Sequence, residues 1–423
     1  MRSSLLTVAL VIACSASAAQ ASAAGITEFS TGITPGSGLG GIAAGPDGNM
    51  WFTERAGRVA RITPEGSVAE YASPATFGSE PLGIAAGQDR AMWFAENLTN
   101  RIGRVTMDGV ITGFPVPTRM SGLSGIALGP DGNMWFTEQL GNAIGRISAG
   151  GEITEFPLPT SNAGPYWIAA GPDGNMWFTE RVANKIGRIT PNGSVSEFSS
   201  GISLNAELLG IAKGPDGNMW FAESNRGQIG RISPEGAVTE FGIPSKADPE
   251  PVGITAGPDR AMWFTDPGGN QIGRMSMSGK VSWFADGLTG RAILFGIAAG
   301  PGNRIWFTER GADRVGRLSV AGPLRVRTVK GQVSARRVIV LSKVIAPSAG
   351  RLSQSVMVGG GPSCKTSAAV TRSGVESLTC DLGRSSRAFL KRQALALVVR
   401  TTFTSRSGEE LASEDRLTIP RRP

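Results

Sequence analysis

A tryptophan recurs seven times along this chain at an almost constant spacing. The copies are Trp51, Trp93, Trp135, Trp177, Trp220, Trp263 and Trp306, which lie 42, 42, 42, 43, 43 and 43 residues apart. Around each copy stands a variant of the stretch from Gly171 to Arg188, GPDGNMWFTERVANKIGR. A period in the low forties with strand-like content is typical of radial arrays of four-stranded units. The repeat therefore predicts an all-β chain that folds as a seven-bladed propeller.

Each copy predicts four short strands. The first is of the Gly-Ile-Ala-Ala type, the second reads Met-Trp-Phe-Thr-Glu, and the third reads Ile-Gly-Arg-Ile. A Pro-Asp-Gly-Asn turn separates the first two, because Pro presets one turn dihedral and Gly accepts a positive φ. The fourth strands alternate polar and apolar residues, and we expect them at 67–71, 110–114, 152–156, 194–198, 237–241 and 280–284.

The seventh copy lacks its fourth strand. It breaks off at Leu318 to Gly322, where Pro323 follows, whereas Gly25 to Phe29 has the missing pattern near the other end of the chain. We therefore expect the N-terminal segment to supply the outer strand of the last blade. Such closure ties the termini of the ring together and leaves only short edges. The propeller is predicted to span residues 25–322.

Residues 1–24 have the pattern of a secretory signal peptide. Arg2 is its charged start, Leu5 to Ala13 its apolar core, and a run of Ala and Ser to Ala24 offers cleavage sites. We expect a secreted or extracellular protein. The alternative is a lipid anchor through Cys14, because Val11 to Cys14 also fits a lipoprotein-type cleavage motif.

Residues 323–423 differ from the repeats in charge and pattern. They hold 18 Lys and Arg against 6 Asp and Glu, a net charge of +12, which leaves −4 for the rest of a chain of net charge +8. Alternating runs at Val338–Val344 and Leu395–Thr404 predict a small β-sandwich. In a secreted chain we expect Cys364 and Cys380 to form a disulfide.

The basic C-terminal region indicates contact with an anionic surface, such as a cell-wall polymer. A basic surface that is merely solvated is the alternative. We expect no specific nucleic-acid partner, and a monomer.

An acidic residue stands three positions after each repeated tryptophan. These are Glu54, Glu96, Glu138, Glu180, Glu223, Asp266 and Glu309. At the ends of seven second strands they are expected to meet near the central tunnel, where oxygen ligands would suit a divalent cation. The alternative is structural: each carboxylate caps a turn or pairs with an arginine seven or eight residues later. Those arginines are Arg61, Arg104, Arg146, Arg188, Arg231, Arg274 and Arg317.

A second set of positions precedes the Gly-Ile of the first strands. It comprises Leu82, Ser124, Tyr166, Leu209, Val252 and Phe295. These residues are predicted either to line a hydrophobic mouth for a flat or cyclic ligand or to serve in ordinary blade packing. Glu80 and Glu250 lie two residues earlier and add carboxylates to that rim. We predict Phe295, Val252, Tyr166 and Glu80 as ligand-binding residues, and Glu309, Asp266 and Glu250 as the candidate metal residues.

The chain contains no histidine. Histidine is the usual general base near neutral pH and a common zinc ligand, so its absence limits the available chemistry. The sequence also has no nucleophile elbow, no phosphate loop and no Cys/His zinc spacing.

The repeats resemble those of the streptogramin B lyase (virginiamycin B lyase) family. The resemblance rests on Gly-Pro-Asp-Gly-Asn-Met-Trp-Phe-Thr-Glu, on Asn184 to Thr190 and on the Thr-Glu-Phe fourth strands, and it covers residues 25 to about 322. It implies an enzyme that linearises a cyclic depsipeptide by elimination at its ester. It also implies Mg²⁺ held by Glu residues, with a His as general base.

The resemblance places Glu309 at the metal-side position of the last blade. The family's histidine before Gly-Ile falls on Phe295, the acidic residue two positions earlier falls on Ile293, and a companion histidine falls on Val252. Elimination requires a base within reach of an acidic C–H, and here only Asp, Glu, Tyr or Lys could serve. We therefore expect the lyase activity to be absent or replaced.

Three functions follow from the sequence. The first is a non-catalytic binding or scaffold protein of the cell envelope, whose partner is a small cyclic peptide or an envelope polymer. The second is a metal-dependent carbon–oxygen lyase that uses Glu309, Asp266 and Glu250 with a base other than histidine. The third is a purely structural surface protein.

Overall fold

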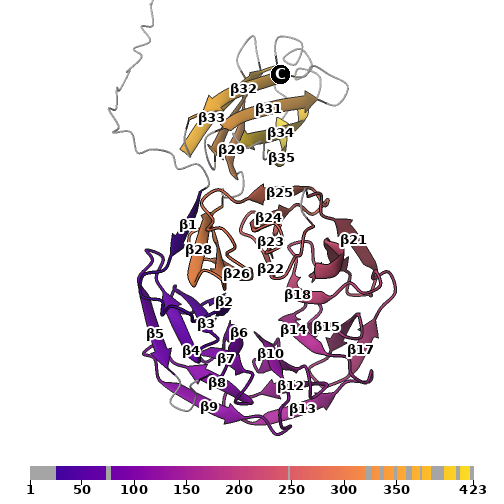
Figure 1. The fold of residues 1–423 in the computed structure, drawn as a ribbon. Helices are drawn as coiled ribbons and strands as arrows, with labels where there is room; N and C mark the ends of the chain where they lie inside the picture. The colour runs from indigo at the N-terminus through magenta and orange to yellow at the C-terminus, as the bar shows by residue number, and fades with distance from the viewer. Residues whose placement is uncertain are drawn as a thin grey trace, which may run out of the picture. The chain divides into compact units, whose positions relative to one another are not determined.

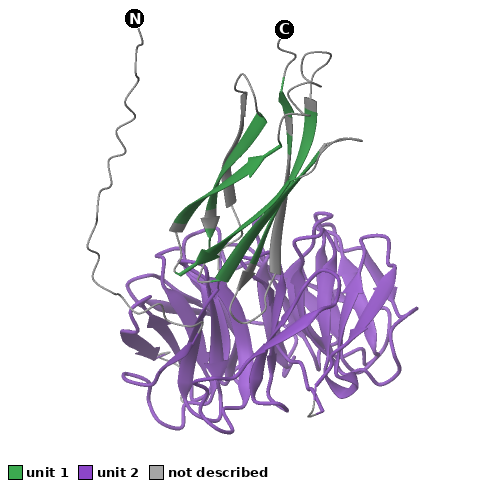
Figure 2. Ribbon diagram, turned by 90° about the horizontal axis from the view of Figure 1, so that it is seen from above, with its two compact units in different colours: residues 1–23, 324–423 green, residues 24–323 purple. Residues whose placement is uncertain are grey.

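A computed structural model describes residues 25–72, 78–245 and 248–320, followed by 325–333, 338–346, 350–358, 364–371, 374–382, 395–405 and 410–419. The contacts divide the chain into two compact units, one made of Ala24–Pro323 and one that contains Leu324–Pro423 (Figure 2). The predicted signal peptide, residues 1–24 with Cys14, lies outside the described residues. No helix in the described segments has the length and apolarity needed to cross a membrane.

The larger unit is a ring of seven four-stranded antiparallel sheets (Figure 1). Blades 1 to 3 comprise β2 (Leu39–Ala44), β3 (Met50–Glu54), β4 (Arg58–Ile62), β5 (Val68–Ala72); β6 (Pro81–Ala86), β7 (Met92–Glu96), β8 (Arg101–Val105), β9 (Ile111–Pro115); and β10 (Leu123–Leu128), β11 (Met134–Glu138), β12 (Ala143–Ile147), β13 (Ile153–Pro157). Blades 4 and 5 comprise β14 (Pro165–Ala170), β15 (Met176–Glu180), β16 (Lys185–Ile189), β17 (Val195–Phe198); and β18 (Leu208–Lys213), β19 (Met219–Glu223), β20 (Gln228–Ile232), β21 (Val238–Gly242), with a 3₁₀ turn η1 (Ser224–Arg226). Blade 6 comprises β22 (Ile254–Ala256), β23 (Met262–Asp266), β24 (Gln271–Met275) and β25 (Val281–Phe284).

The seventh blade contains both ends of the propeller. Its strands are β26 (Leu294–Gly300), β27 (Arg304–Glu309), β28 (Arg314–Ser319) and the N-terminal β1 (Ile26–Phe29). They pair in the order β1-β28-β27-β26, with Ile26 opposite Leu318 and Phe29 opposite Val315. The predicted closure by the N-terminal segment is therefore confirmed.

The repeated tryptophans build the contacts between blades. Trp177 is fully buried and packs against residues of the next blade, such as Leu208 and Phe221. Its ring stacks on Phe198 of its own outer strand, with ring centroids 5.5 Å apart, and its Nε1–H donates to Asp173 of the turn at 3.0 Å. Stacked aromatic pairs add to the energy of apolar burial, so one motif fixes the turn, the outer strand and the neighbouring blade.

The arginines of the repeat do not pair with the acidic residues after the tryptophans, so that part of the prediction is wrong. Arg188 lies over the Trp177 ring and reaches Asp173 at 3.7 Å. The reason is register. Trp177 and Arg188 are cross-strand partners, whereas Glu180 stands opposite Lys185, three residues further along the hairpin.

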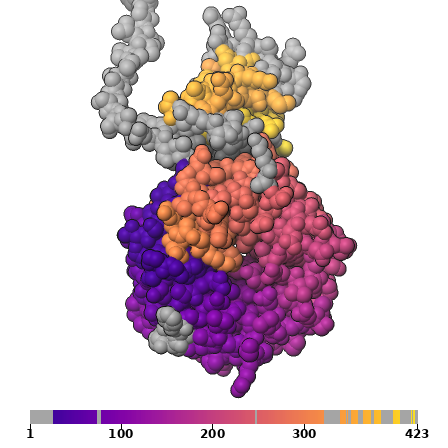
Figure 3. All heavy atoms as spheres, in the orientation of Figure 1, coloured from indigo at the N-terminus to yellow at the C-terminus, as the bar shows by residue number. Residues whose placement is uncertain are grey.

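The first strands pack closely around the axis of the ring. A Cβ atom added at Gly41 would lie 2.7 Å from the carbonyl oxygen of Leu82 in the next blade. Such a distance is below any normal contact, so this position must be glycine while the blades stay this close. The side chains of the seven blades leave only a narrow centre (Figure 3).

The smaller unit is a β-sandwich with a disulfide, as predicted. One sheet has the order β29 (Arg325–Val333), β30 (Val338–Ala346), β33 (Gly374–Asp381), and the other has β32 (Cys364–Val370), β31 (Gly350–Val358), β34 (Leu395–Ser405), β35 (Glu410–Ile419). Val340 of the first sheet shares a buried cluster with Val356 and Val399 of the second. Cys364 and Cys380 form a disulfide that joins β32 to β33, and so links the two sheets.

Candidate functional site

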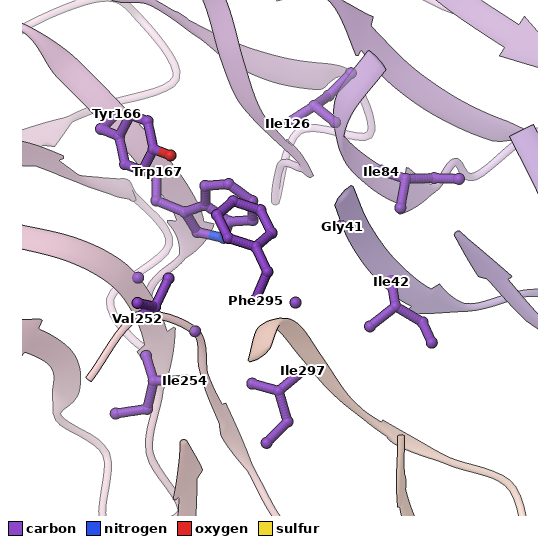
Figure 4. Close-up of a pocket in the computed structure, with 13 residues that line it drawn as sticks. Gly41, Ile42, Ile84, Ile126, Tyr166, Trp167, Val252, Ile254, Phe295 and Ile297 are labelled. Carbon is purple, nitrogen blue, oxygen red and sulfur yellow. The ribbon is translucent and has the colours of Figure 1, made fainter. Parts of the chain in front are cut away.

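A cavity of about 80 Å³ lies where the first strands of the seven blades meet. Every blade contributes to its lining, and the exposed faces are apolar side chains and glycine backbone (Figure 4). Cavities lined by apolar and aromatic side chains, with a few polar groups between them, are the common form of small-molecule sites. Here the backbone of the lining glycines supplies polar groups. The cavity is therefore the candidate functional site of the propeller.

Three aromatic side chains dominate this cavity. Tyr166 and Trp167 come from β14, and Phe295 comes from β26. The rings of Trp167 and Phe295 meet edge to face with centroids 6.1 Å apart, and Figure 4 shows them together at the centre of the site. Tyr166 lies beside Trp167, with ring centroids 5.9 Å apart.

The structure brings three of the four predicted ligand-binding residues to the cavity, namely Phe295, Val252 and Tyr166. The fourth, Glu80, lies outside the lining and forms a 2.7 Å ion pair with Arg55. Trp167 also lines the cavity and was not among the predicted ligand-binding residues. Its signal was a break in the repeat, because Trp167 stands where six other blades carry the glycine of Gly-Ile.

Guanidinium groups gather around these aromatic rings. Arg181 lies over Tyr166 at 5.7 Å from the ring centroid and pairs with Glu207. Arg310 lies directly on Phe295, with its Cζ 3.7 Å from the ring centroid. The sequence analysis did not single out these arginines, although each directly follows an acidic residue of the ring.

Arg310 is held firmly but is poorly satisfied. Its Nε–H donates to the backbone oxygen of Leu39 at 3.2 Å, whereas its Nη2 is enclosed without a hydrogen-bond acceptor among the described residues. Burial, followed by the charge of Arg55, lowers the pKa of Arg310 below its ordinary value. An arginine with so high an intrinsic pKa stays charged at neutral pH, so it places an uncompensated positive charge beside the cavity.

The acidic residues after the tryptophans do not gather at the tunnel. In five blades the buried glutamate of the second strand lies beside a glutamate of its own outer strand instead. The pairs are Glu54 with Glu70, Glu138 with Glu155, Glu180 with Glu197, Glu223 with Glu240, and Glu309 with Glu28. Burial, and then the charge of the neighbouring glutamate, raises the pKa of each second-strand member to about 8.

The outer glutamates are anchored by the loop that leads into each blade. Glu155 accepts hydrogen bonds from the backbone N–H and the hydroxyl of Thr118, both at 2.9 Å. Glu28 accepts the equivalent pair from Thr289 and is also bound by Arg314 at 2.6 Å. Although burial acts in the opposite direction, these hydrogen bonds lower the pKa of Glu28. In each pair the second-strand glutamate is therefore the member whose pKa is raised, and the outer glutamate is the anchor of the loop.

The residues predicted to hold a metal do not fit Mg²⁺. Glu309 is fully buried, and its raised pKa of about 8 keeps it protonated at neutral pH. Asp266 already accepts N–H groups from Glu250, Gly269 and Gln271 at 2.9, 3.2 and 2.9 Å. Glu250 is exposed.

The two positions that would complete the family's site carry no oxygen or nitrogen ligand, because they are Ile293 and Phe295. No cluster of three or more acidic, Cys or His side chains able to hold a metal occurs among the described residues. We therefore derive no chemical step that passes through a metal.

Comparison with known proteins gives consistent matches over the propeller. A profile of the virginiamycin B lyase family matches residues 13–204 and 201–343. A solved streptogramin B lyase is 35% identical, with a TM-score of 0.66, and the alignment covers 70% of this chain and 97% of that one. Virginiamycin B lyase from Staphylococcus aureus is 36% identical, with a TM-score of 0.66 and coverage of 70% and 99%.

A further solved structure is a catalytically inactive histidine-to-alanine variant of the Staphylococcus aureus enzyme with quinupristin. It is 36% identical, with a TM-score of 0.65 and coverage of 70% and 99%. Among curated proteins, no significant match is found.

Proposed function

The chain belongs to the virginiamycin B lyase family, and from that premise we propose that it is a secreted, non-catalytic binding protein of the cell envelope. The proposal rests on one observation. The position of the family's base is occupied by Phe295, whose ring fills the centre of the cavity. A phenyl ring accepts no proton, and an elimination without a base loses most of its rate.

No other side chain at the cavity replaces that base. Tyr166 is the only titratable group among the described residues that line the cavity, and burial raises its pKa further above its ordinary value. A tyrosine in that state keeps its proton at neutral pH. The related enzyme whose histidine is replaced by alanine is described as catalytically inactive, and by analogy the same loss is proposed here.

The β-sandwich supplies the envelope-binding half of the proposal. An open trough of about 420 Å³ lies over β31, β32 and β34. Lys365 and Arg400 stand in it with Ser353, Ser355 and Thr402. Two cations among hydroxyl groups suit an anionic, hydroxyl-rich polymer, because both charge and hydrogen bonding are matched.

The test uses the chain without its first 24 residues. We expect it to sediment with purified anionic cell-wall polymer, and we expect a Lys365→Glu, Arg400→Glu double variant to lose at least tenfold in affinity, because like charges then repel. An Arg90→Glu, Arg119→Glu variant of the propeller is the matched control. Equal sedimentation of all three proteins would contradict envelope binding.

The alternative function is tested with the same preparation. Incubation with a type B streptogramin and Mg²⁺ is expected to give no linear product by mass spectrometry. Turnover that disappears in a Glu309→Gln variant would instead support the metal-dependent lyase with a base other than histidine.

A further inference from the structure

The guanidinium groups around the aromatic rings of the cavity differ in whether they have an ion-pair partner. Three such groups are those of Arg55, Arg181 and Arg310. Arg55 pairs with Glu80 and Arg181 pairs with Glu207. Arg310 makes no ion pair with any described residue. Among these three groups, the guanidinium of Arg310 is therefore the one without a carboxylate partner in the described part of the chain.

Arg310 is preorganised for a planar anion. Stacking on Phe295 at 3.7 Å and the hydrogen bond to Leu39 fix the plane of the guanidinium group. Of its five N–H donors, only the Nε–H is used in the described part of the chain, and Nη2 is enclosed without an acceptor. A buried donor without a partner is costly, and a carboxylate that displaced the groups enclosing Nη2 would remove that cost.

The neighbouring surfaces are flat and apolar. Trp167 and Phe295 meet edge to face, and Tyr166 lies next to them. Arg310 is thus the cationic end of an aromatic wall. Arginine binds carboxylates through two parallel hydrogen bonds, a geometry that lysine cannot reproduce.

We infer that the tunnel mouth binds a small organic anion, a carboxylate carried on a flat apolar body. The inference rests on the proposed non-catalytic role and states what the altered site recognises. Phe295 removes the family's proton acceptor and provides the surface on which Arg310 is held. The site has changed from one suited to removing a proton to one suited to holding a negative charge.

The experiment uses 4-fluorobenzoate as the probe, with ¹⁹F NMR on the chain lacking residues 1–24. We expect saturable binding, and at least tenfold weaker binding of the uncharged isostere 4-fluorobenzamide. Arg310→Gln is expected to weaken binding of the benzoate at least tenfold. Arg310→Lys keeps the positive charge but loses the two parallel N–H donors of the guanidinium group, so its affinity for the benzoate is expected to lie between those of the parent and Arg310→Gln. Arg119→Gln, at an exposed position, is the matched control and is expected to bind as the parent does.

A second measurement tests binding in proteins that keep Arg310, so the test remains valid if the Arg310 variants do not fold. Trp167 is partly exposed at the site and the seven repeated tryptophans are buried, whereas the ninth, Trp283, is partly exposed on the outer strand β25, so quenching that depends on Trp167 reports binding. Quenching by the probe is expected in the parent and is expected to be lost in Trp167→Phe. Equal affinity for benzoate in Arg310→Gln and the parent, or no saturable binding, would overturn the inference. Turnover of a streptogramin would instead overturn the proposed function, so the two failures are distinguishable.

Discussion

At the scale of single residues, the most unusual feature is the set of neutral carboxyl groups buried inside the blades. Glu138 is fully buried, and burial together with the charge of Glu155 raises its pKa to about 8. In the unfolded chain a glutamate titrates near 4.3. The folded propeller therefore holds a proton at Glu138 that the unfolded chain has released at neutral pH, and folding stability must depend on pH through this group.

We expect the stability of the propeller to fall as pH rises from about 4.5 to about 8. Between these values the folded state binds more protons than the unfolded chain, so the free energy of unfolding declines as pH rises, and this contribution levels off above pH 8. Glu138→Gln has no proton to lose, so its free energy of unfolding should decline less steeply with pH than that of the parent. Urea unfolding at pH 5, 6.5 and 8 measures the slope.

Glu152→Gln is the control for that comparison, because Glu152 is exposed on the same blade. Its pH slope should match that of the parent. A Glu138→Gln slope that also equals the parent's would show that Glu138 is ionised in the folded state.

At the scale of the repeated element, blade 7 departs from the others in its first turn. Six repeated tryptophans donate their Nε1–H to the turn aspartate four residues earlier, as Trp177 does to Asp173. Gly302 stands at that position in blade 7, and the buried Nε1 of Trp306 has no partner among the described residues. The turn is also different, because Gly302 and Asn303 both have positive φ, at 74° and 56°.

Restoring the usual turn is expected to stabilise blade 7. The double variant Gly302→Asp, Asn303→Gly reproduces the Asp-Gly of blade 4, where only Gly174 has positive φ. It should raise the free energy of unfolding by about 1–2 kcal/mol, because an unsatisfied buried donor gains an acceptor. Comparing the thermal unfolding of the double variant with that of Asn303→Gly alone separates the stability gained from the new hydrogen bond from the effect of the glycine substitution. No gain beyond the single variant would refute this account.

At the scale of the whole molecule, the ring depends on one short N-terminal strand. β1 adds the stack of Phe29 on Trp306, with ring centroids 5.9 Å apart, and the anchor of Glu28 on Thr289. This is where strands from the two ends of the propeller sequence meet. In blades 1 to 6 the outer strand follows its neighbour directly in the sequence, so losing it affects mainly that blade. Losing β1 would instead remove the strand that joins the two ends of the propeller.

Phe29→Ala is therefore expected to loosen blade 7 more than an equivalent change loosens another blade. Phe114→Ala is the matched control, because Phe114 stacks on Trp93 in the same way but lies within a continuous blade. Hydrogen exchange of the amides of β26, β27 and β28 should accelerate in Phe29→Ala, and those of blade 2 should change less in Phe114→Ala. Similar exchange changes in the two variants would show that closure is not the weak point.

The repeat by itself determined the architecture. Its spacing, turns and alternation predicted the blades and the strand supplied by Gly25 to Phe29, because these depend on local patterns that recur. The sandwich and its disulfide were predicted separately, from the alternating runs and the two cysteines that follow the repeats. The absence of histidine could also be read directly from the sequence. The positions of Phe295, Val252 and Tyr166 at the cavity could be predicted because the repeat aligns each first strand with the others.

Only the tertiary structure decided which groups face one another. The partner of Glu309 is Glu28, which lies at the other end of the propeller sequence and is brought there by ring closure. Arg310 and Trp167 come from different blades and meet only through Phe295. The physical reason is that a repeat fixes the place of each residue within its blade. The contacts that determine the pKa values and the shape of the candidate site form between strands and across the axis of the ring. Residue spacing along the sequence does not show which of these side chains come close together.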